Sequence, residues 1–68
     1  MLLDDVERII SEKPGLTATQ IARVLYGPRG YAEQVNHGCL ALARLGRIER
    51  RGGGGPGDPF KYFPLGPK

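Results

Sequence analysis

The chain has 68 residues, a formal net charge of +3, and a composition of 40% hydrophobic and 25% charged residues, which suits one small globular domain. A single cysteine, Cys39, excludes an intrachain disulfide and leaves no second thiolate for a zinc site, so we expect neither a metal nor a cofactor. Because the start is acidic and no apolar run is long, we expect no secretory signal, no membrane span and a cytoplasmic protein.

The first predicted element is an amphipathic helix that begins at Leu3 or Asp4 and is stopped by Pro14-Gly15. Its apolar residues recur at helical spacing and form one stripe, made of Leu2, Leu3, Val6, Ile9 and Ile10. The pattern indicates a helix that closes the core and carries no chemistry.

A second, shorter helix is predicted from Thr17-Ala18-Thr19-Gln20, which has the pattern of a capping box. In that arrangement the Thr17 hydroxyl accepts from the Gln20 N–H while the Gln20 side chain reaches back to the cap. The residues that we expect to face the core are Ile21, Ala22 and Leu25. Gly27-Pro28 then ends the helix.

The third predicted helix runs from about Tyr31 to Leu45. Its core-facing side contains Tyr31, Val35, Gly38, Cys39, Leu42 and Leu45. Its outward side contains Glu33, Asn36, His37, Leu40, Ala41 and Arg44. We interpret Gly38 as a point of close helix–helix approach, Cys39 as a small buried hydrophobe, and Glu33 as the partner of His37 one turn on.

A β-hairpin is predicted after Gly46, which we expect to cap the third helix. Residues 47–51 form its first strand with Ile48 inside, and residues 59–63 form its return strand. The return strand places Phe60 and Tyr62 on one face and Lys61 and Phe63 on the other.

The glycine-rich loop between these strands, residues 52–58, is expected to be mobile until a partner orders it. Pro64 is expected to end the return strand. We therefore place the domain at residues 1–64 and a flexible tail at residues 65–68.

This order of elements resembles the winged helix-turn-helix superfamily over nearly the whole chain. The resemblance is carried by residues 17–25, by residues 34–42, by the pattern Leu-x-x-Leu-Gly-x-Ile-Glu-Arg from Leu42 to Arg50, and by the glycine loop ending in Phe60-Lys61-Tyr62. It implies an α+β fold of three helices followed by a two-stranded β-hairpin wing. The superfamily also implies DNA binding, although it includes RNA binders and protein-interaction modules.

A narrower similarity is to the Z-alpha domains, which bind left-handed nucleic acid. It is carried by Val35-Asn36 and by the Pro-plus-aromatic pair Pro59-Phe60. In that family a helix Asn, matched here by Asn36, works with a Tyr one turn later, where this chain has Leu40. Ordinary B-form DNA is therefore the interpretation that we carry forward.

The basic residues gather in the second half of the chain. Residues 1–28 carry three basic and four acidic side chains, a net −1, whereas residues 29–68 carry seven basic and three acidic ones, a net +4. Seven of the ten basic residues are Arg, whose guanidinium suits bidentate contacts with phosphate and guanine. This distribution is typical of a protein that binds a polyanion.

The predicted DNA contacts fall into two groups. The outward stripe of the third helix would read base edges in the major groove through Asn36, His37, Leu40 and Arg44. The wing and the turn before the third helix would hold phosphates through Arg29, Arg50, Arg51 and Lys61. The alternatives are a solvated helix face and a charged hairpin edge that opposes aggregation.

We expect a double-stranded DNA-binding module of a transcriptional or mobile-element regulator. The alternative is a winged helix used for protein–protein interaction or RNA binding. We do not expect an enzyme, because the carboxylates show no paired spacing and no Ser/His/Asp or Cys/His pattern is present. Homodimerisation and fusion to a larger protein both remain open from the sequence.

Overall fold

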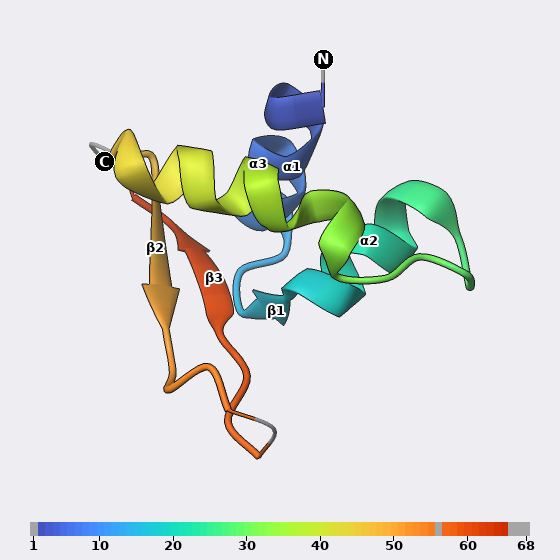
Figure 1. Cartoon of the computed structure of the whole chain (residues 1–68). Helices are drawn as coiled ribbons and strands as arrows, with labels where there is room; N and C mark the ends of the chain where they lie inside the picture. The colour runs from blue at the N-terminus through green and yellow to red at the C-terminus, as the bar shows by residue number, and fades with distance from the viewer. Residues whose placement is uncertain (1, 56, 66–68) are drawn as a thin grey trace.

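In the computed structural model, which describes residues 2–55 and 57–65, three helices pack against a three-stranded antiparallel sheet (Figure 1). The elements in chain order are α1 (Leu2–Glu12), β1 (Leu16–Thr17), α2 (Ala18–Tyr26), α3 (Glu33–Arg44), β2 (Ile48–Arg51) and β3 (Lys61–Pro64). The strand order in the sheet is β1-β3-β2, so the last strand along the chain lies in the middle. The fold is therefore α+β, as predicted.

The strand β1 corrects the prediction of a two-stranded sheet. Leu16 pairs with Tyr62 and Thr17 pairs with Lys61. The backbone N–H of Gly15 also donates to the Tyr62 carbonyl, at 2.8 Å. The sequence did not reveal this strand because two residues carry no periodicity, and the strand exists only against a partner far along the chain.

The predicted capping box of α2 is confirmed. The Thr17 Oγ1 accepts from the Gln20 N–H at 3.3 Å, and the Gln20 Oε1 accepts from the Thr17 N–H at 2.8 Å. At the other end, the N–H of Gly27 donates to the Arg23 carbonyl, and Gly27 has a φ of 90°. Both ends of this short helix are therefore set by local hydrogen bonds.

Helix α3 ends in a Schellman motif at Gly46, which is the predicted cap. Gly46 has a φ of 75°, its N–H donates to the Ala43 carbonyl at 3.1 Å, and the Arg47 N–H donates to the Leu42 carbonyl at 2.9 Å. The helix is shorter than predicted at both ends. Tyr31 and Leu45 consequently lie outside it and are 55% and 65% exposed, so placing them in the core was wrong.

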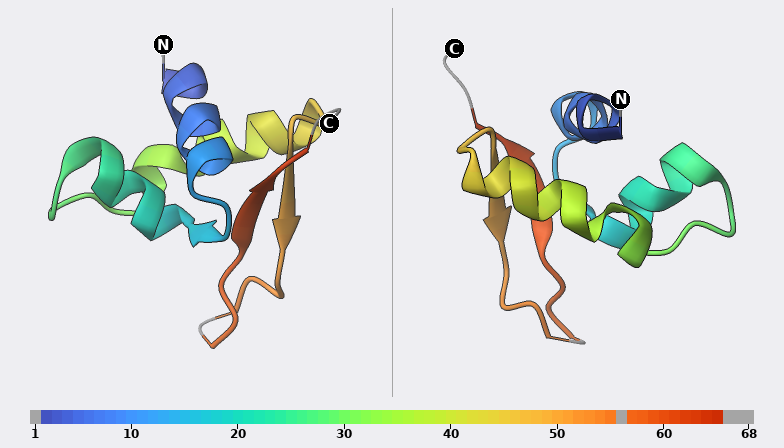
Figure 2. Two further views of the ribbon diagram at one scale, coloured as in Figure 1. Left: turned by 180° about the vertical axis from the view of Figure 1, so that it is seen from behind. Right: turned by 45° about the horizontal axis from the view of Figure 1, so that its top comes forward.

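The core draws on all three helices and on the hairpin strands. Its buried side chains are Val6, Ile9, Ile10, Ile21, Ala22, Val35, Cys39, Leu42, Ile48 and Tyr62. Leu3 and Leu25 pack against it while partly exposed, and the side chain of Leu2 lies outside the described part of the chain. Viewed from behind, α1 crosses α3 (Figure 2). The predicted close approach at Gly38 is confirmed, because a Cβ atom there would lie 3.4 Å from Leu3 Cδ2.

The strands β2 and β3 form the predicted hairpin, in the register Ile48↔Pro64, Glu49↔Phe63, Arg50↔Tyr62 and Arg51↔Lys61. The pairing continues one residue beyond the predicted domain end, since the Leu65 N–H donates to the Arg47 carbonyl at 3.1 Å. Residues 66–68, the rest of the predicted tail, lie outside the described residues. The return strand β3 begins at Lys61, two residues later than predicted, and Pro64 is its last residue.

The loop between β2 and β3 is organised around Asp58. The Asp58 Oδ2 accepts from the Gly53 N–H at 2.8 Å, and the Asp58 carbonyl accepts from the Gly54 N–H at 2.8 Å. Gly52 and Gly54 have φ values of 115° and 82°, which other residues adopt with strain.

None of the helices in the described residues is both long and apolar enough to cross a membrane.

Candidate functional site

The predicted outward stripe of α3 is solvent-exposed. Its four members are Asn36, His37, Leu40 and Arg44, and the Leu40 side chain is the marginal case at 37% exposure. The predicted pair of Glu33 with His37 is absent, although both residues are described and exposed. Two exposed side chains gain little from one another in water, so nothing holds that pair together.

The hairpin cations lie on two different faces of the sheet. Successive residues of a strand alternate between faces, so Arg50 shares the inner face with the buried Tyr62, while Arg51 and Lys61 lie on the outer face. The Arg50 guanidinium carbon lies 4.2 Å from the centroid of the Phe60 ring. The sequence analysis placed these cations in one group. The register of β2 against β3 shows that Arg50 lies on one face of the sheet and that Arg51 and Lys61 lie on the other.

Arg51 has partners of its own on the outer face. Its Nη2 donates to Glu49 Oε1 at 3.0 Å, and its guanidinium lies 4.3 Å from the Phe63 ring centroid. The hydrogen bond lowers the pKa of the Glu49 carboxyl and raises the pKa of Arg51. Arg51 is therefore partly neutralised before it meets any ligand.

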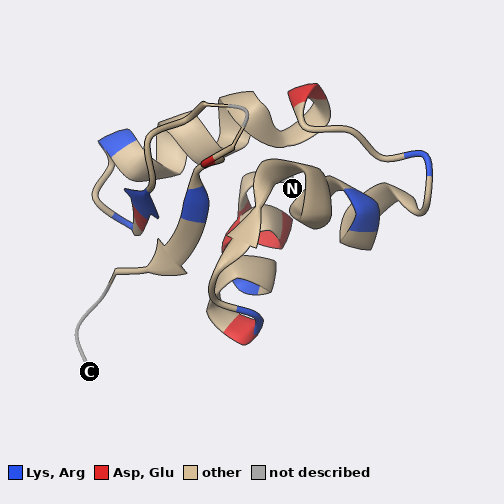
Figure 3. Cartoon of the chain, turned by 90° about the horizontal axis from the view of Figure 1, so that it is seen from below, with Lys and Arg blue, Asp and Glu red and all other residues tan. Residues whose placement is uncertain are grey.

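Arg29 is exposed and lies apart from the other predicted cations, in the loop between α2 and α3. Viewed from below, the basic residues of the hairpin lie at one side of the molecule and that of the α2–α3 loop at the other (Figure 3). Helix α3 runs between these two positions. The candidate surface thus has cations on either side of a polar helix face.

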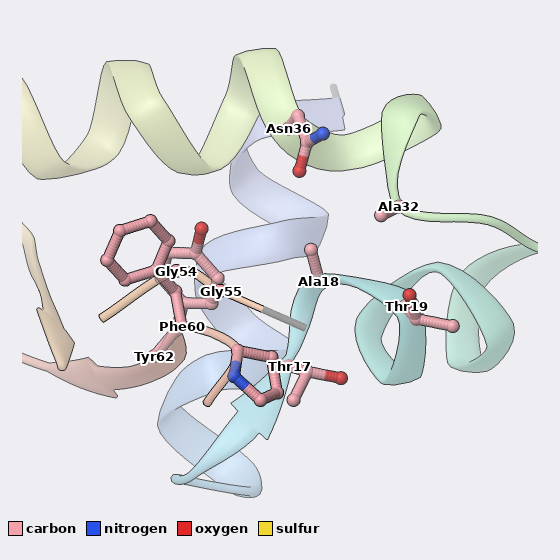
Figure 4. A pocket seen from close by; sticks show the side chains of 10 residues that line it. Thr17, Ala18, Thr19, Ala32, Asn36, Gly54, Gly55, Phe60 and Tyr62 are labelled. Atoms are coloured by element: carbon pink, nitrogen blue, oxygen red, sulfur yellow. The ribbon is translucent and has the colours of Figure 1, made fainter. Parts of the chain in front are cut away.

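A pocket of about 280 Å³ lies on this surface and was missed by sequence reasoning. Three segments meet around it, namely the first turn of α2, the start of α3, and the hairpin (Figure 4). Its lining residues are Thr17, Ala18, Thr19, Ala32, Asn36, Gly54, Gly55, Pro59, Phe60 and Tyr62. The pocket depends on β1 pairing with β3, so no local sequence pattern could reveal it.

Two titratable side chains lie below this surface. Burial raises the pKa of the Cys39 thiol to about 11, although an interaction with the Tyr62 hydroxyl acts in the opposite direction. Burial and the neighbouring Cys39 raise the pKa of Tyr62, while Arg50 acts to lower it. Cys39 is fully buried, which confirms that it serves as a small hydrophobe.

The described residues contain no group of three or more His, Cys, Asp or Glu side chains that could hold a metal ion.

No family model, no curated protein and no solved structure matches the chain. The arrangement of its residues is therefore the basis for any functional conclusion.

Proposed function

We propose that the chain is a winged helix-turn-helix module that binds double-stranded DNA. Helix α3 would enter the major groove, and the β2–β3 hairpin, as the wing, would lie on the phosphate backbone. The order α1-β1-α2-α3-β2-β3 with the sheet order β1-β3-β2 supports this assignment, because it brings the hairpin beside the exposed side of α3.

The observation that carries the proposal is the exposed stripe of α3 flanked by cations. Asn36 can pair with adenine, and Arg44 can pair with guanine. Among the described residues, the flanking cations Arg29 and Arg50 form no ion pair, which leaves them available for phosphates on either side of the groove. One exposed carboxylate, Glu33, lies beside this stripe at the first residue of α3.

The structure's division of the hairpin refines the predicted contacts. Arg50 faces the same side as Asn36, since both border the aromatic residues of the pocket. Arg51 and Lys61 lie on the outer face and would reach a phosphate only at the edge of the interface. Arg50 is therefore the principal wing contact in this proposal.

An amide chemical-shift titration with a random-sequence duplex tests the proposal. We expect shifts at Asn36, His37, Leu40 and Arg44 and in the hairpin, and little change on α1. If three or four cations contact phosphates, log K should fall against log salt with a slope of about −3 to −4.

Parallel titrations with an RNA hairpin and with a single strand distinguish duplex DNA from the RNA-binding alternative. No binding to duplex DNA at low salt, or shifts confined to α1, would remove the DNA proposal. A salt-independent affinity would also contradict it, because phosphate contacts release counterions.

A further inference from the structure

The pocket described above lies within the proposed DNA-binding surface and shares Asn36 with it, while its other lining residues have no role in the proposed function. Its volume of about 280 Å³ is just below the ~300–1,000 Å³ of pockets that hold drug-sized molecules. This space suits a single planar ring system better than it suits a larger ligand. Asn36 faces it from α3, and Phe60 and Tyr62 contribute to it from the hairpin (Figure 4).

The lining combines aromatic surface with neutral hydrogen-bonding groups. Phe60 and Tyr62 provide the aromatic part, and none of the lining residues is charged. The Asn36 amide offers both donors and an acceptor, which are the groups that the edge of a nucleobase requires. Proteins recognise unstacked bases through this combination of an aromatic surface and an amide.

A cation lies directly beside this neutral pocket. The Arg50 guanidinium lies over the Phe60 ring, which forms part of the pocket wall. An unstacked nucleotide consists of a neutral ring joined to an anionic phosphate. The pocket could accept the ring while Arg50 contacts the phosphate, so the distribution of charge matches this ligand.

We propose that this pocket binds one unstacked nucleobase held in the DNA that the protein contacts. The inference rests on the proposed function and extends it, because the preferred ligand becomes a duplex that carries an extrahelical base. A fully paired duplex would occupy α3 and the wing and leave the pocket empty. The free energy of unstacking is smaller for a bulged base than for a paired one, which favours such sites.

The glycines of the hairpin loop offer matched variants for a test. A Cβ atom at Gly55, which lines the pocket, would meet no heavy atom within 4 Å, so Gly55→Val should fold and reduce the space. A Cβ atom at Gly57 would also meet nothing within 4 Å, and Gly57 is not a lining residue. Gly57→Val is therefore the control, and Ala32→Leu is a second blocking variant on a different wall.

The test compares three duplexes of equal length by fluorescence anisotropy: fully paired, with one bulged adenine, and with a bulged abasic nucleotide. We expect the adenine bulge to bind at least about fivefold more tightly than the paired duplex, since stacking one base on an aromatic residue favours binding by about that factor or more. The abasic bulge, which bends the duplex without offering a base, should bind like the paired duplex. Gly55→Val and Ala32→Leu should abolish the preference, and Gly57→Val should retain it.

Equal affinity for the paired and adenine-bulged duplexes would overturn the inference and leave the proposed function standing. A preference that the abasic bulge shares would assign the effect to bending, and a preference that both blocking variants retain would place the base outside this pocket. Either result would also overturn the inference. If no duplex binds, the proposed function fails as well. Chemical shifts at the lining residues with free adenosine monophosphate, without duplex binding, would indicate a nucleotide pocket and reject the DNA-held base.

Discussion

Glu7 holds Arg47 through both of its carboxylate oxygens. The Arg47 Nε lies 2.9 Å from Glu7 Oε2, and its Nη2 lies 2.8 Å from Glu7 Oε1. The pair joins α1 to the corner between α3 and β2. Arg47 is therefore bound in an ion pair, whereas Arg50 has an aromatic neighbour and no ion pair among the described residues.

The first prediction compares Arg47→Ala with Arg50→Ala. Arg50→Ala should reduce the slope of log K against log salt by about one unit, because one phosphate contact is lost. Arg47→Ala should leave the slope unchanged and lower the free energy of unfolding by less than about 1 kcal/mol, as expected for an exposed ion pair. Anisotropy titrations over a range of salt concentrations measure the first effect, and urea denaturation measures the second. If Arg50→Ala leaves the slope of the unmodified protein unchanged, Arg50 is not a phosphate contact.

The second prediction separates base reading from positioning. Asn36→Ala should cost about 1–3 kcal/mol of binding free energy on a preferred duplex and little on random DNA. Arg51→Ala should weaken binding to every duplex alike, and by less than Arg50→Ala does, since Glu49 already pairs with Arg51. Competition titrations with selected and random duplexes provide the measurement. If Asn36→Ala instead unfolds the domain, Asn36 is a structural residue and the assignment of the reading face is wrong.

The third prediction concerns two buried glycines. Gly38→Ala should stabilise the protein by up to about 1 kcal/mol, because its Cβ would make ordinary contacts with Leu3 and Val6 while α3 gains helix propensity. Gly30→Ala should destabilise it by about 1–3 kcal/mol, because its Cβ would lie 2.6 Å from the Ala22 carbonyl carbon and 2.9 Å from the Arg23 nitrogen. Thermal denaturation of both variants measures the difference. A stable Gly30→Ala protein would mean that the α2–α3 loop can move away from α2.

The fourth prediction is a loss of stability at alkaline pH. The pKa of Cys39 is about 11 in the folded protein against an ordinary 9.0, so the unfolded chain releases this proton first. The stabilising contribution is therefore complete below pH 9 and decreases between pH 9 and 11, by roughly 2–3 kcal/mol in total. The raised pKa of Tyr62 acts in the same direction. Urea denaturation between pH 7 and 11 should show a shallower decline for Cys39→Ala, and an identical decline would contradict the prediction.

The fifth prediction concerns the hairpin loop, whose expected mobility stays a prediction. Because Asp58 accepts two backbone hydrogen bonds, only one of them through its side chain, Asp58→Ala should lower the backbone order parameters of Gly53 more than those of Gly54. Values below about 0.6 mark a flexible backbone on the fast timescale of NMR relaxation. The same relaxation measurement should find Ile48 and Tyr62 rigid in both proteins. Unchanged values at Gly53 would mean that the Asp58 carboxylate does not order the loop.

The parts of the fold that short-range chemistry determines could be predicted from the sequence. The capping box at Thr17 and the glycine cap at Gly46 involve neighbouring residues only, and both are confirmed. The apolar periodicity of α3 identified the buried side chains Val35, Cys39 and Leu42. The same periodicity was extended too far at Tyr31 and Leu45, because a helical period applies only between the helix ends.

Features that depend on contacts between distant residues could not be predicted in this way. The Arg47–Glu7 pair and the strand β1 each join residues from opposite parts of the chain. The position of Pro64 illustrates the same point. The Leu65 N–H donates toward β2, so the nitrogen of the preceding residue, Pro64, points to the opposite edge of β3. At that edge β1 pairs only with Lys61 and Tyr62. A proline is accepted there because no donor is required of it.

For the candidate site, the sequence predicted which residues are exposed. It could not predict which of the hairpin cations lie on the same face of the sheet. The stripe of α3 follows from helical spacing and could be predicted. The division between Arg50 and Arg51 depends on the register of β2 against β3, which neither strand reveals alone. The pocket between α2, α3 and the hairpin requires the complete tertiary arrangement.

The central position of β3 has a consequence for how the protein folds during synthesis. Both other strands pair with residues 61–64, so the sheet cannot close before this segment leaves the ribosome. The three helices precede it and can form earlier, but Tyr62, a member of their core, is synthesised after all of them. The long loop closure that joins Leu16 to Tyr62 should therefore limit the folding rate. A nascent chain stalled before residue 61 would expose its apolar helix faces to chaperones and proteases.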